Sequence, residues 1–180
     1  TNIGTHNVVY TDIENTDNYD HIYQSDLCGW VGQLGYNKDS IYGANVFTAE
    51  GNETLKAASF YATGKDSQYE LYVVRQFADE SSLEKMIPVA SGKLGNAGYY
   101  TVDFNQGIEV DAGERYAVVL HIITPGSVHP MAIEYAADEA TENVDLDDGE
   151  SYISVHGSKW ASVDTVEKSN LCIKAFSDNR

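Results

Sequence analysis

The strongest constraint on this chain is a succession of short apolar runs separated by turn residues. Residues 41–49, 55–63 and 69–76 are rich in Tyr, Val and Phe, and Glu50-Gly51-Asn52 and residues 64–67 lie between them. Runs of this length and composition, bounded by Gly, Asn, Asp and Ser, predict β-strands joined by tight turns.

The second half of the sequence continues this pattern. In residues 99–105, Tyr100, Val102 and Phe104 alternate with polar positions, which predicts a strand with one buried face. Residues 115–124 are the most apolar run, and we expect further strands at 89–94, 131–135, 152–155, 160–163 and 171–176. A single helical turn is predicted at 81–86, with Ser81 as its cap.

Strands dominate this pattern, and no helices separate them as a parallel α/β fold requires. We therefore predict an all-β fold: an antiparallel β-sandwich of jelly-roll type, resembling lectins and carbohydrate-binding modules. The length of 180 residues suits one domain. Residues 1–20 are polar and rich in turn residues, so we expect a linker or leading strand there and a single domain over 21–180.

The first residue and the lengths of the apolar runs bear on where the chain comes from and whether it enters a membrane. The chain begins at Thr1 without a leader, which suggests an excised piece or a mature product. Its apolar runs fall far short of the ~20 residues of a membrane-spanning helix, so we expect no membrane insertion.

The charge is strongly negative, with 28 acidic residues against 11 Lys and Arg and a net charge of −17. Such a surface repels phosphate backbones, which argues against nucleic-acid partners. It attracts cations, and clustered carboxylates on a flexible loop suit Ca²⁺, although the spacing is not that of an EF-hand. The same clusters also fit ordinary solvated loops. The candidate calcium ligands are Asp145, Asp147, Asp148, Asp17 and Asp20.

Cys28 and Cys172 lie near opposite ends of the chain. They could form a disulfide that closes a long loop, or they could be two free buried thiols. Two thiols alone cannot complete a four-ligand zinc site.

We find no sequence motif of a hydrolase, nucleotide-binding enzyme or metalloprotease, so we expect the chain not to be an enzyme. Aromatic residues offer a different function, because sugars stack their apolar faces on Trp and Tyr rings. Several of these residues lie in or beside predicted turns, where a binding face would expose them; the alternative for each is packing in the core. The candidate carbohydrate-binding residues are Trp30, Tyr36, Tyr42, Tyr99 and Trp160.

Several segments together resemble a known family. They include residues 21–26, Gly29-Trp30, residues 44–49, 53–61 and 69–73, and later 92–94, 96–101, 113–119, 124–126, 130–134, 149–154 and 172–176. This set is similar to the lectin-like domain that follows papain-like cysteine peptidases in Gram-positive anaerobes such as clostridia. The resemblance covers about residues 20–176, and the acidic loop 137–148 matches least.

The resemblance implies a β-sandwich that serves as a non-catalytic accessory module of a secreted or cell-surface bacterial protein, with a cysteine peptidase as its parent. It implies an extracellular or cell-wall-associated location and bound structural calcium, but it does not by itself imply a sugar ligand. The exposed aromatic candidates lead us to predict a glycan or cell-wall polysaccharide as the ligand. The alternative is a structural or docking module that packs against the parent peptidase and binds no glycan.

Overall fold

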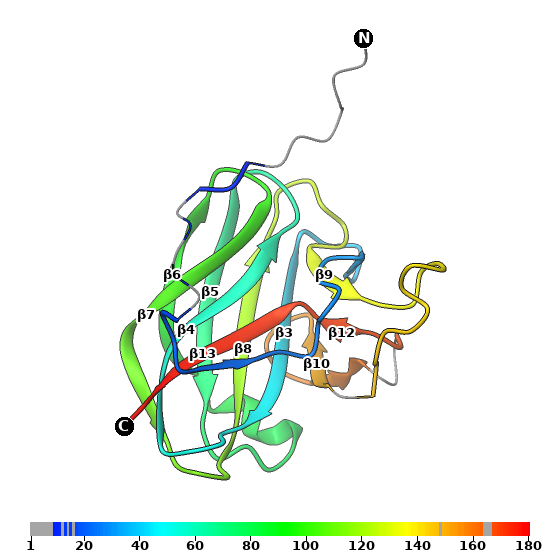
Figure 1. Ribbon diagram of the computed structural model, residues 1–180. Helices are drawn as coiled ribbons and strands as arrows, with labels where there is room; N and C mark the ends of the chain where they lie inside the picture. Colours follow the sequence, from blue (N-terminus) through cyan, green and yellow to red (C-terminus); the bar gives the residue numbers. More distant parts are fainter. Residues whose placement is uncertain (1–8, 12, 14, 16, 148, 164–166) are drawn as a thin grey trace.

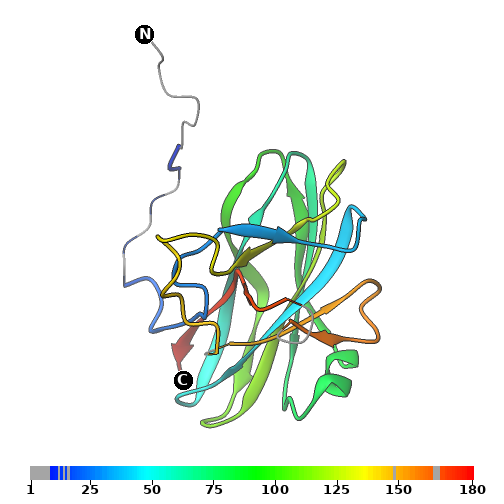
Figure 2. The same cartoon turned by 90° about the vertical axis from the view of Figure 1, so that its right-hand side faces the viewer.

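The computed structural model describes residues 9–11, 13, 15, 17–147, 149–163 and 167–180. The described strands form three antiparallel sheets, two of which are large (Figures 1 and 2). The four-stranded sheet has the order β1 (His21–Tyr23), β13 (Ile173–Asn179), β4 (Glu53–Ala62) and β7 (Gly98–Val110). In Figure 1, β13 runs between β1 and β4, so the two ends of the domain meet in one sheet.

The six-stranded sheet is the larger layer. Its order is β11 (Ala161–Ser162), β10 (Glu150–Ser154), β3 (Ser40–Thr48), β8 (Arg115–Ile123), β5 (Ser67–Val74) and β6 (Ile87–Leu94). A small third sheet contains β12 (Asn170–Leu171), β9 (Met131–Glu134) and β2 (Gly32–Leu34). The prediction of an all-β antiparallel sandwich of jelly-roll type is confirmed.

The predicted helical turn is present in a shifted form. It is a 3-10 helix, η1 (Glu80–Glu84), and its cap is Asp79 rather than Ser81. The Asp79 side chain accepts a hydrogen bond of 3.0 Å from the Ser81 N–H, and Ser82 completes the capping box. The predicted cap was therefore two residues too late. Asp and Ser are both good N-cap residues, so the sequence alone did not show which of Asp79 and Ser81 caps the turn.

The main core lies between the two large sheets. Alternate residues of β8, including Tyr116 and Leu120, point inward and meet Leu55 and Phe60 of β4 and Ile173 of β13. All five are at most 1% exposed. Burial of this apolar area is the main source of stability of the sandwich.

A second, smaller core covers the outer face of the six-stranded sheet. Phe77 and Leu83 of the η1 region pack on Ala117 and Val119, which are the β8 residues that alternate with the main-core set. Figure 2 shows η1 and the β10–β11 hairpin on the same side of the molecule. This cover lies over Ala44, Val46, Val74, Ala117 and Val119 of the outer face. The part of the same face around Gln68, Ser91 and Lys93 is outside it.

The described part of residues 1–20 contains no strand, and the first described strand begins at His21. The end of this segment nevertheless packs on the four-stranded sheet, because the Tyr19 ring lies 5.0 Å from the Phe176 ring and its hydroxyl donates to Asp103. Whether residues 1–20 act as a linker stays a prediction. Among the described residues, no helix has the length and apolarity needed to cross a membrane.

A buried carboxylate joins three strands of the four-stranded sheet. Glu53 of β4 is 0% exposed and accepts hydrogen bonds from Tyr23 of β1, Ser177 of β13 and the Gly51 N–H. Burial alone would raise the Glu53 pKa, but the hydrogen bonds from Ser177, Tyr23 and Gly51 outweigh it, so the pKa lies below its ordinary value. The ionised carboxylate is therefore the form that stabilises the fold.

We predict that Glu53→Gln lowers the free energy of unfolding by about 1–3 kcal/mol, because the amide nitrogen would face donors in a buried site. Urea unfolding at neutral pH measures this loss. The exposed Glu139→Gln is the control, with an expected change within about 0.5 kcal/mol.

The same substitution has a pH signature. A carboxylate with a lowered folded-state pKa stabilises the fold above the ordinary value of 4.5, and its contribution is lost as the pH falls through the lowered pKa. The wild type should therefore lose more stability than Glu53→Gln between pH 5 and the acid transition. Parallel pH dependences of the two proteins would contradict this role of Glu53.

Candidate functional site

The five aromatic residues predicted as carbohydrate ligands fall in three places. Trp30 and Tyr99 lie on the outer face of the four-stranded sheet. Tyr42 and Trp160 lie on the outer face of the six-stranded sheet, beside the second core. Tyr36 packs against the main core, so the core alternative holds for this residue.

Trp30, Tyr61 and Tyr99 form a continuous row, which we call the aromatic strip. The ring centroids of Trp30 and Tyr61 are 5.8 Å apart, and those of Tyr61 and Tyr99 are 5.0 Å apart. Tyr61 of β4 and Tyr99 of β7 are direct cross-strand partners. Trp30 is 36% exposed and Tyr99 is 45% exposed, so the strip presents ring surface to solvent.

The loop before β2 brings Trp30 onto this row. Gly29 has φ of +70°, and a Cβ there would lie 2.9 Å from the Tyr61 hydroxyl, so the loop can approach Tyr61 this closely because residue 29 is glycine. The Trp30 backbone also bonds to the Tyr61 hydroxyl. Contacts with the Gly29–Trp30 backbone therefore fix the position of the Tyr61 ring in the strip.

Polar groups lie next to the strip. The Tyr99 hydroxyl donates to Ser59 Oγ at 2.6 Å, which fixes the ring. Asp26 is 1% exposed and pairs with Lys174 at 2.9 Å, while its Oδ2 has no hydrogen-bond partner in the described chain. Burial raises the Asp26 pKa, although the Lys174 charge opposes the shift. After burial, the Asp26 charge also contributes to the raised pKa of Tyr61 and Tyr99, so this carboxylate is close to the rings.

Sequence reasoning missed Tyr61. It lies inside a predicted strand, at 55–63, and its neighbours Phe60 and Ala62 are fully buried. Strand alternation indicates that Tyr61 faces outward, but nothing in the sequence indicates that β7 and the Trp30 loop flank it.

A hydrogen-bonded group around His121, which we call the His121 network, lies on the opposite outer face. The His121 ring is stacked on Tyr42 with centroids 3.9 Å apart and planes 2° apart. His121 Nδ1 lies 2.7 Å from Glu70 Oε2, and Nε2 lies 2.9 Å from Ser40 Oγ. The hydrogen bond with His121 lowers the Glu70 pKa, so Glu70 is a carboxylate and His121 Nδ1 donates to it. His121 Nε2 shares the second hydrogen bond with the Ser40 hydroxyl. Tyr72 also donates to Glu70 Oε2.

The order Ser40–His121–Glu70 is the order of a nucleophile, a base and an orienting acid in serine hydrolases. Such sites also require donors arranged in advance for an oxyanion, and a hydrogen-bonded row does not supply them. One face of the His121 ring is covered by Tyr42, and Glu70 is shared with Tyr72. The arrangement suits a rigid support better than a reacting group.

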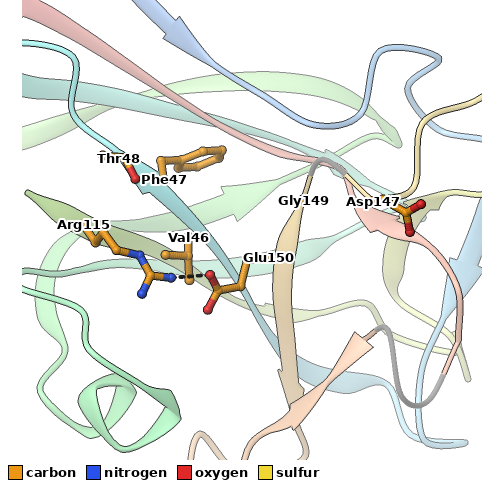
Figure 3. A pocket seen from close by; sticks show the side chains of 7 residues that line it. All are labelled: Val46, Phe47, Thr48, Arg115, Asp147, Gly149 and Glu150. Atoms are coloured by element: carbon orange, nitrogen blue, oxygen red, sulfur yellow. Dashed lines mark hydrogen bonds and ion pairs between the residues drawn. The ribbon is translucent and has the colours of Figure 1, made fainter. Parts of the chain in front are cut away.

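A third feature is a cleft of about 440 Å³ at the opposite end of the six-stranded sheet, lined by Val46, Phe47, Thr48, Arg115, Asp147, Gly149 and Glu150. Arg115 and Glu150 point toward each other and form an ion pair, and Asp147 is set apart from them (Figure 3). The Arg115 guanidinium also lies 5.0 Å from the Phe77 ring centroid. Among the described lining residues the cation is Arg115, and because Glu150 and Phe77 already engage it, Arg115 is not free to bind an anionic ligand.

Comparison with known proteins gives the family. A model described as a lectin-like domain matches residues 22–177. The chain belongs to the lectin-like domain family. Among curated proteins, none matches the sequence significantly.

Two solved structures resemble the lectin-like domain described above. One is the clostridial cysteine protease Cwp84 after propeptide cleavage, in a variant with one cysteine replaced by alanine, with a TM-score of 0.72 and 24% identity over 89% of this chain. The other contains the cysteine protease and lectin-like domains of Cwp84, a surface-layer-associated protein of Clostridium difficile, with a TM-score of 0.66 and 20% identity over 89% of this chain. This domain spans 40% and 36% of those two chains. At these identities the likeness establishes the shared fold.

The described members of the predicted calcium-ligand set, Asp145, Asp147, Asp17 and Asp20, do not form one cluster of carboxylates. Asp145 and Asp147 are exposed, and Asp145 accepts a hydrogen bond from the Asp147 N–H. Asp17 is exposed and Asp20 accepts from Asn179, while Asp148 is outside the described residues. Within the described ranges, no group of three or more His, Cys, Asp or Glu side chains is placed to hold a metal ion. Backbone carbonyls and water can also bind calcium, so this result does not test calcium binding, which stays a prediction.

The possible disulfide is not formed in this structure, where Cys28 and Cys172 are both free thiols. Cys172 is buried between β12 and β13, and burial, followed by the Asp26 charge, raises its pKa. Cys28 is exposed in the loop before β2, and its N–H donates to Glu134. The alternative of two buried thiols therefore holds for Cys172 only, because the turn around Gly29 keeps Cys28 at the surface.

The calcium prediction has a direct test. If structural calcium is bound, EDTA should lower the melting temperature of the lectin-like domain by about 5–10 °C, which corresponds to ~2.7 kcal/mol for a site at 100 times its Kd. Calcium added in excess should restore the midpoint, and magnesium is the control ion. An unmoved midpoint would remove the calcium expectation.

The absence of catalysis can be tested at the His121 network. We predict that the lectin-like domain hydrolyses 4-nitrophenyl acetate no faster than Ser40→Ala, because the row lacks an arranged oxyanion site. Stopped-flow absorbance would detect a burst. A burst that disappears in Ser40→Ala would show that this lectin-like domain is an enzyme.

Proposed function

We propose that this chain is a non-catalytic accessory module that binds carbohydrate through the aromatic strip. The observation that carries the proposal is the row of Trp30, Tyr61 and Tyr99, with adjacent rings and two members more than a third exposed. Successive sugar faces of a glycan chain stack on such rows of rings, and the hydroxyl groups of the sugars bond to polar side chains nearby.

The surroundings of the strip support a polar, ring-shaped ligand. Lys174 bonds to Gln24 at 2.7 Å as well as to Asp26, so donors and acceptors lie beside the rings. The site is open rather than enclosed, which suits an internal segment of a polymer. Affinity at such a shallow surface is millimolar to micromolar, about −4 to −8 kcal/mol.

The charge of the domain narrows the ligand class. With a net charge of −17, the surface disfavours polymers dense in phosphate or carboxylate. A neutral glycan or cell-wall polysaccharide is therefore the better ligand. In the strip region, the Lys174 cation is neutralised by Asp26.

We place the module in a secreted or cell-surface bacterial protein whose catalytic part is a cysteine peptidase. The support is family membership together with similarity to Cwp84, whose described parts are a cysteine protease and a lectin-like domain. One similar structure is of a surface-layer-associated protein, which favours an extracellular or cell-wall-associated location. In this setting, binding of the wall polymer would raise the effective concentration of the peptidase at its substrate.

A specific observation favours docking as a second function. Val9, Tyr10 and Ile13 are 78%, 81% and 84% exposed, and Leu27 is 73% exposed. Large apolar side chains as exposed as these lose contact with water when another protein surface packs on them, which favours association. The alternative is therefore a docking module that packs these residues against the parent peptidase and binds no glycan.

We predict that Trp30→Ala and Tyr99→Ala each weaken glycan binding at least tenfold, ~1.4 kcal/mol, because each removes a stacking face. A glycan array and a wall-polysaccharide pull-down identify the ligand, and titration calorimetry measures its affinity.

Ile87→Ala is the matched control, because Ile87 is 39% exposed on β6 of the other sheet. The glycan affinity of Ile87→Ala should equal that of the wild type. If no wall or plant polysaccharide binds, and Tyr10→Ser with Ile13→Ser lowers the stability of the full parent protein, the docking function replaces the glycan-binding function.

A further inference from the structure

The outer face of the six-stranded sheet holds a second small site, which we call the hollow. Its volume is about 300 Å³. It is lined by residues of β5, β6 and β8: Gln68, Tyr69, Glu70, Ser91, Gly92, Lys93, His121 and Ile123. It lies on the half of this face that η1 and Phe77 leave uncovered.

Strand register builds the hollow from two rows of cross-strand neighbours. In the first row, Ser91, Glu70, His121 and Tyr42 are successive partners across β6, β5, β8 and β3. In the second row, the partners are Lys93, Gln68, Ile123 and Ser40 across the same strands. Because all belong to one face of an antiparallel sheet, their side chains converge on the same surface.

One side of the hollow is rigid. His121 is held by Tyr42, Ser40 and Glu70, and Glu70 is also held by Tyr72. Burial and then the bond to Glu70 raise the pKa of Tyr72 to about 12, so its hydroxyl keeps its proton and stays a donor. Side chains fixed in this way need no ordering when a ligand binds.

The other side has unused hydrogen-bonding capacity. Gln68, Ser91 and Lys93 are exposed, and their side chains make no hydrogen bond or ion pair within the described residues. An amide and a hydroxyl can each donate and accept, whereas an ammonium group donates only. The second carboxylate oxygen of Glu70 adds an acceptor, since both bonds to Glu70 end on Oε2.

We propose that the hollow is a second carbohydrate site, which binds a single sugar unit at the end of a chain through its neighbouring hydroxyls. Alternating donors and acceptors match vicinal hydroxyl groups, each of which also donates and accepts. The charges of Glu70 and Lys93 balance within the lining, so a neutral sugar is favoured over an ionic ligand. The small volume admits one unit, whereas the open strip accepts a longer segment.

The two sites lie on opposite outer faces of the sandwich. A ligand on the strip contacts β4 and β7, whereas a ligand in the hollow contacts β5, β6 and β8. One molecule can therefore hold two polymer chains at once, so the module cross-links chains as well as anchoring to them. This inference shares only the ligand class with the proposed function, because it rests on a different surface.

The experiment uses a panel of methyl glycosides and short oligosaccharides with calorimetry and amide NMR shifts. We expect a stoichiometry of two for oligosaccharides, with shifts at both Gln68 and Tyr99. Gln68→Ala with Lys93→Ala should weaken binding of the single sugar at least tenfold and reduce the oligosaccharide stoichiometry to one. Lys85→Ala with Gln106→Ala, two exposed residues that do not line the hollow, should change neither value.

Precipitation of a soluble polysaccharide tests cross-linking. The wild type should precipitate the polymer, while either the hollow double variant or Trp30→Ala should bind without precipitating it. Methyl glycosides that cause no shift around Gln68, with a stoichiometry of one in the wild type, would overturn the inference and leave the strip intact. Conversely, if the sugars cause shifts around Gln68 but none at Tyr99, the proposed function fails and the inference about the hollow stands.

Discussion

The structure depends on the apolar interface between its two large antiparallel sheets. Leu55 and Phe60 on one sheet, and Tyr116 and Leu120 on the other, must face each other to be buried. Because side chains alternate along a strand, burial of this set places every intervening residue on an outer face. Tyr61, Glu70 and His121 are outward for this reason. Both candidate binding surfaces are thus consequences of how the core is packed.

Long-range pairing then decides which outward residues become neighbours. β4 pairs with β7, which places Tyr61 beside Tyr99, and β5 pairs with both β6 and β8, which places Glu70 between Ser91 and His121. The C-terminal β13 joins β1 to β4, and Glu53 of β4 accepts hydrogen bonds from Tyr23 of β1 and Ser177 of β13. The same junction fixes the loop that carries Asp26 and Trp30.

The two surfaces differ in physical character, and this difference shapes their proposed roles. The strip offers open ring surface with a buried ion pair beside it, whereas the hollow offers a preorganised polar floor with exposed donors and acceptors at its rim. Each is suited to recognition without bond breaking. The Ser40–His121–Glu70 row shows how a sheet face can place side chains in a catalytic order while using them as a support.

The sequence by itself determined the all-β class, because period-two alternation and turn residues are local signals. Its matching segments also carried the family resemblance, which the family model over residues 22–177 confirms. The sequence also identified Trp30 and Tyr99 as exposed candidates, although it gave Tyr36 the same status when that ring packs on the core. Only the tertiary structure decided that Tyr61 completes the strip, that the candidate acidic residues it describes form no group that could hold a metal ion, and that Cys28 and Cys172 are free thiols. The strip depends on which distant strands pair and in what register, and a one-residue shift would turn Tyr61 to the opposite face.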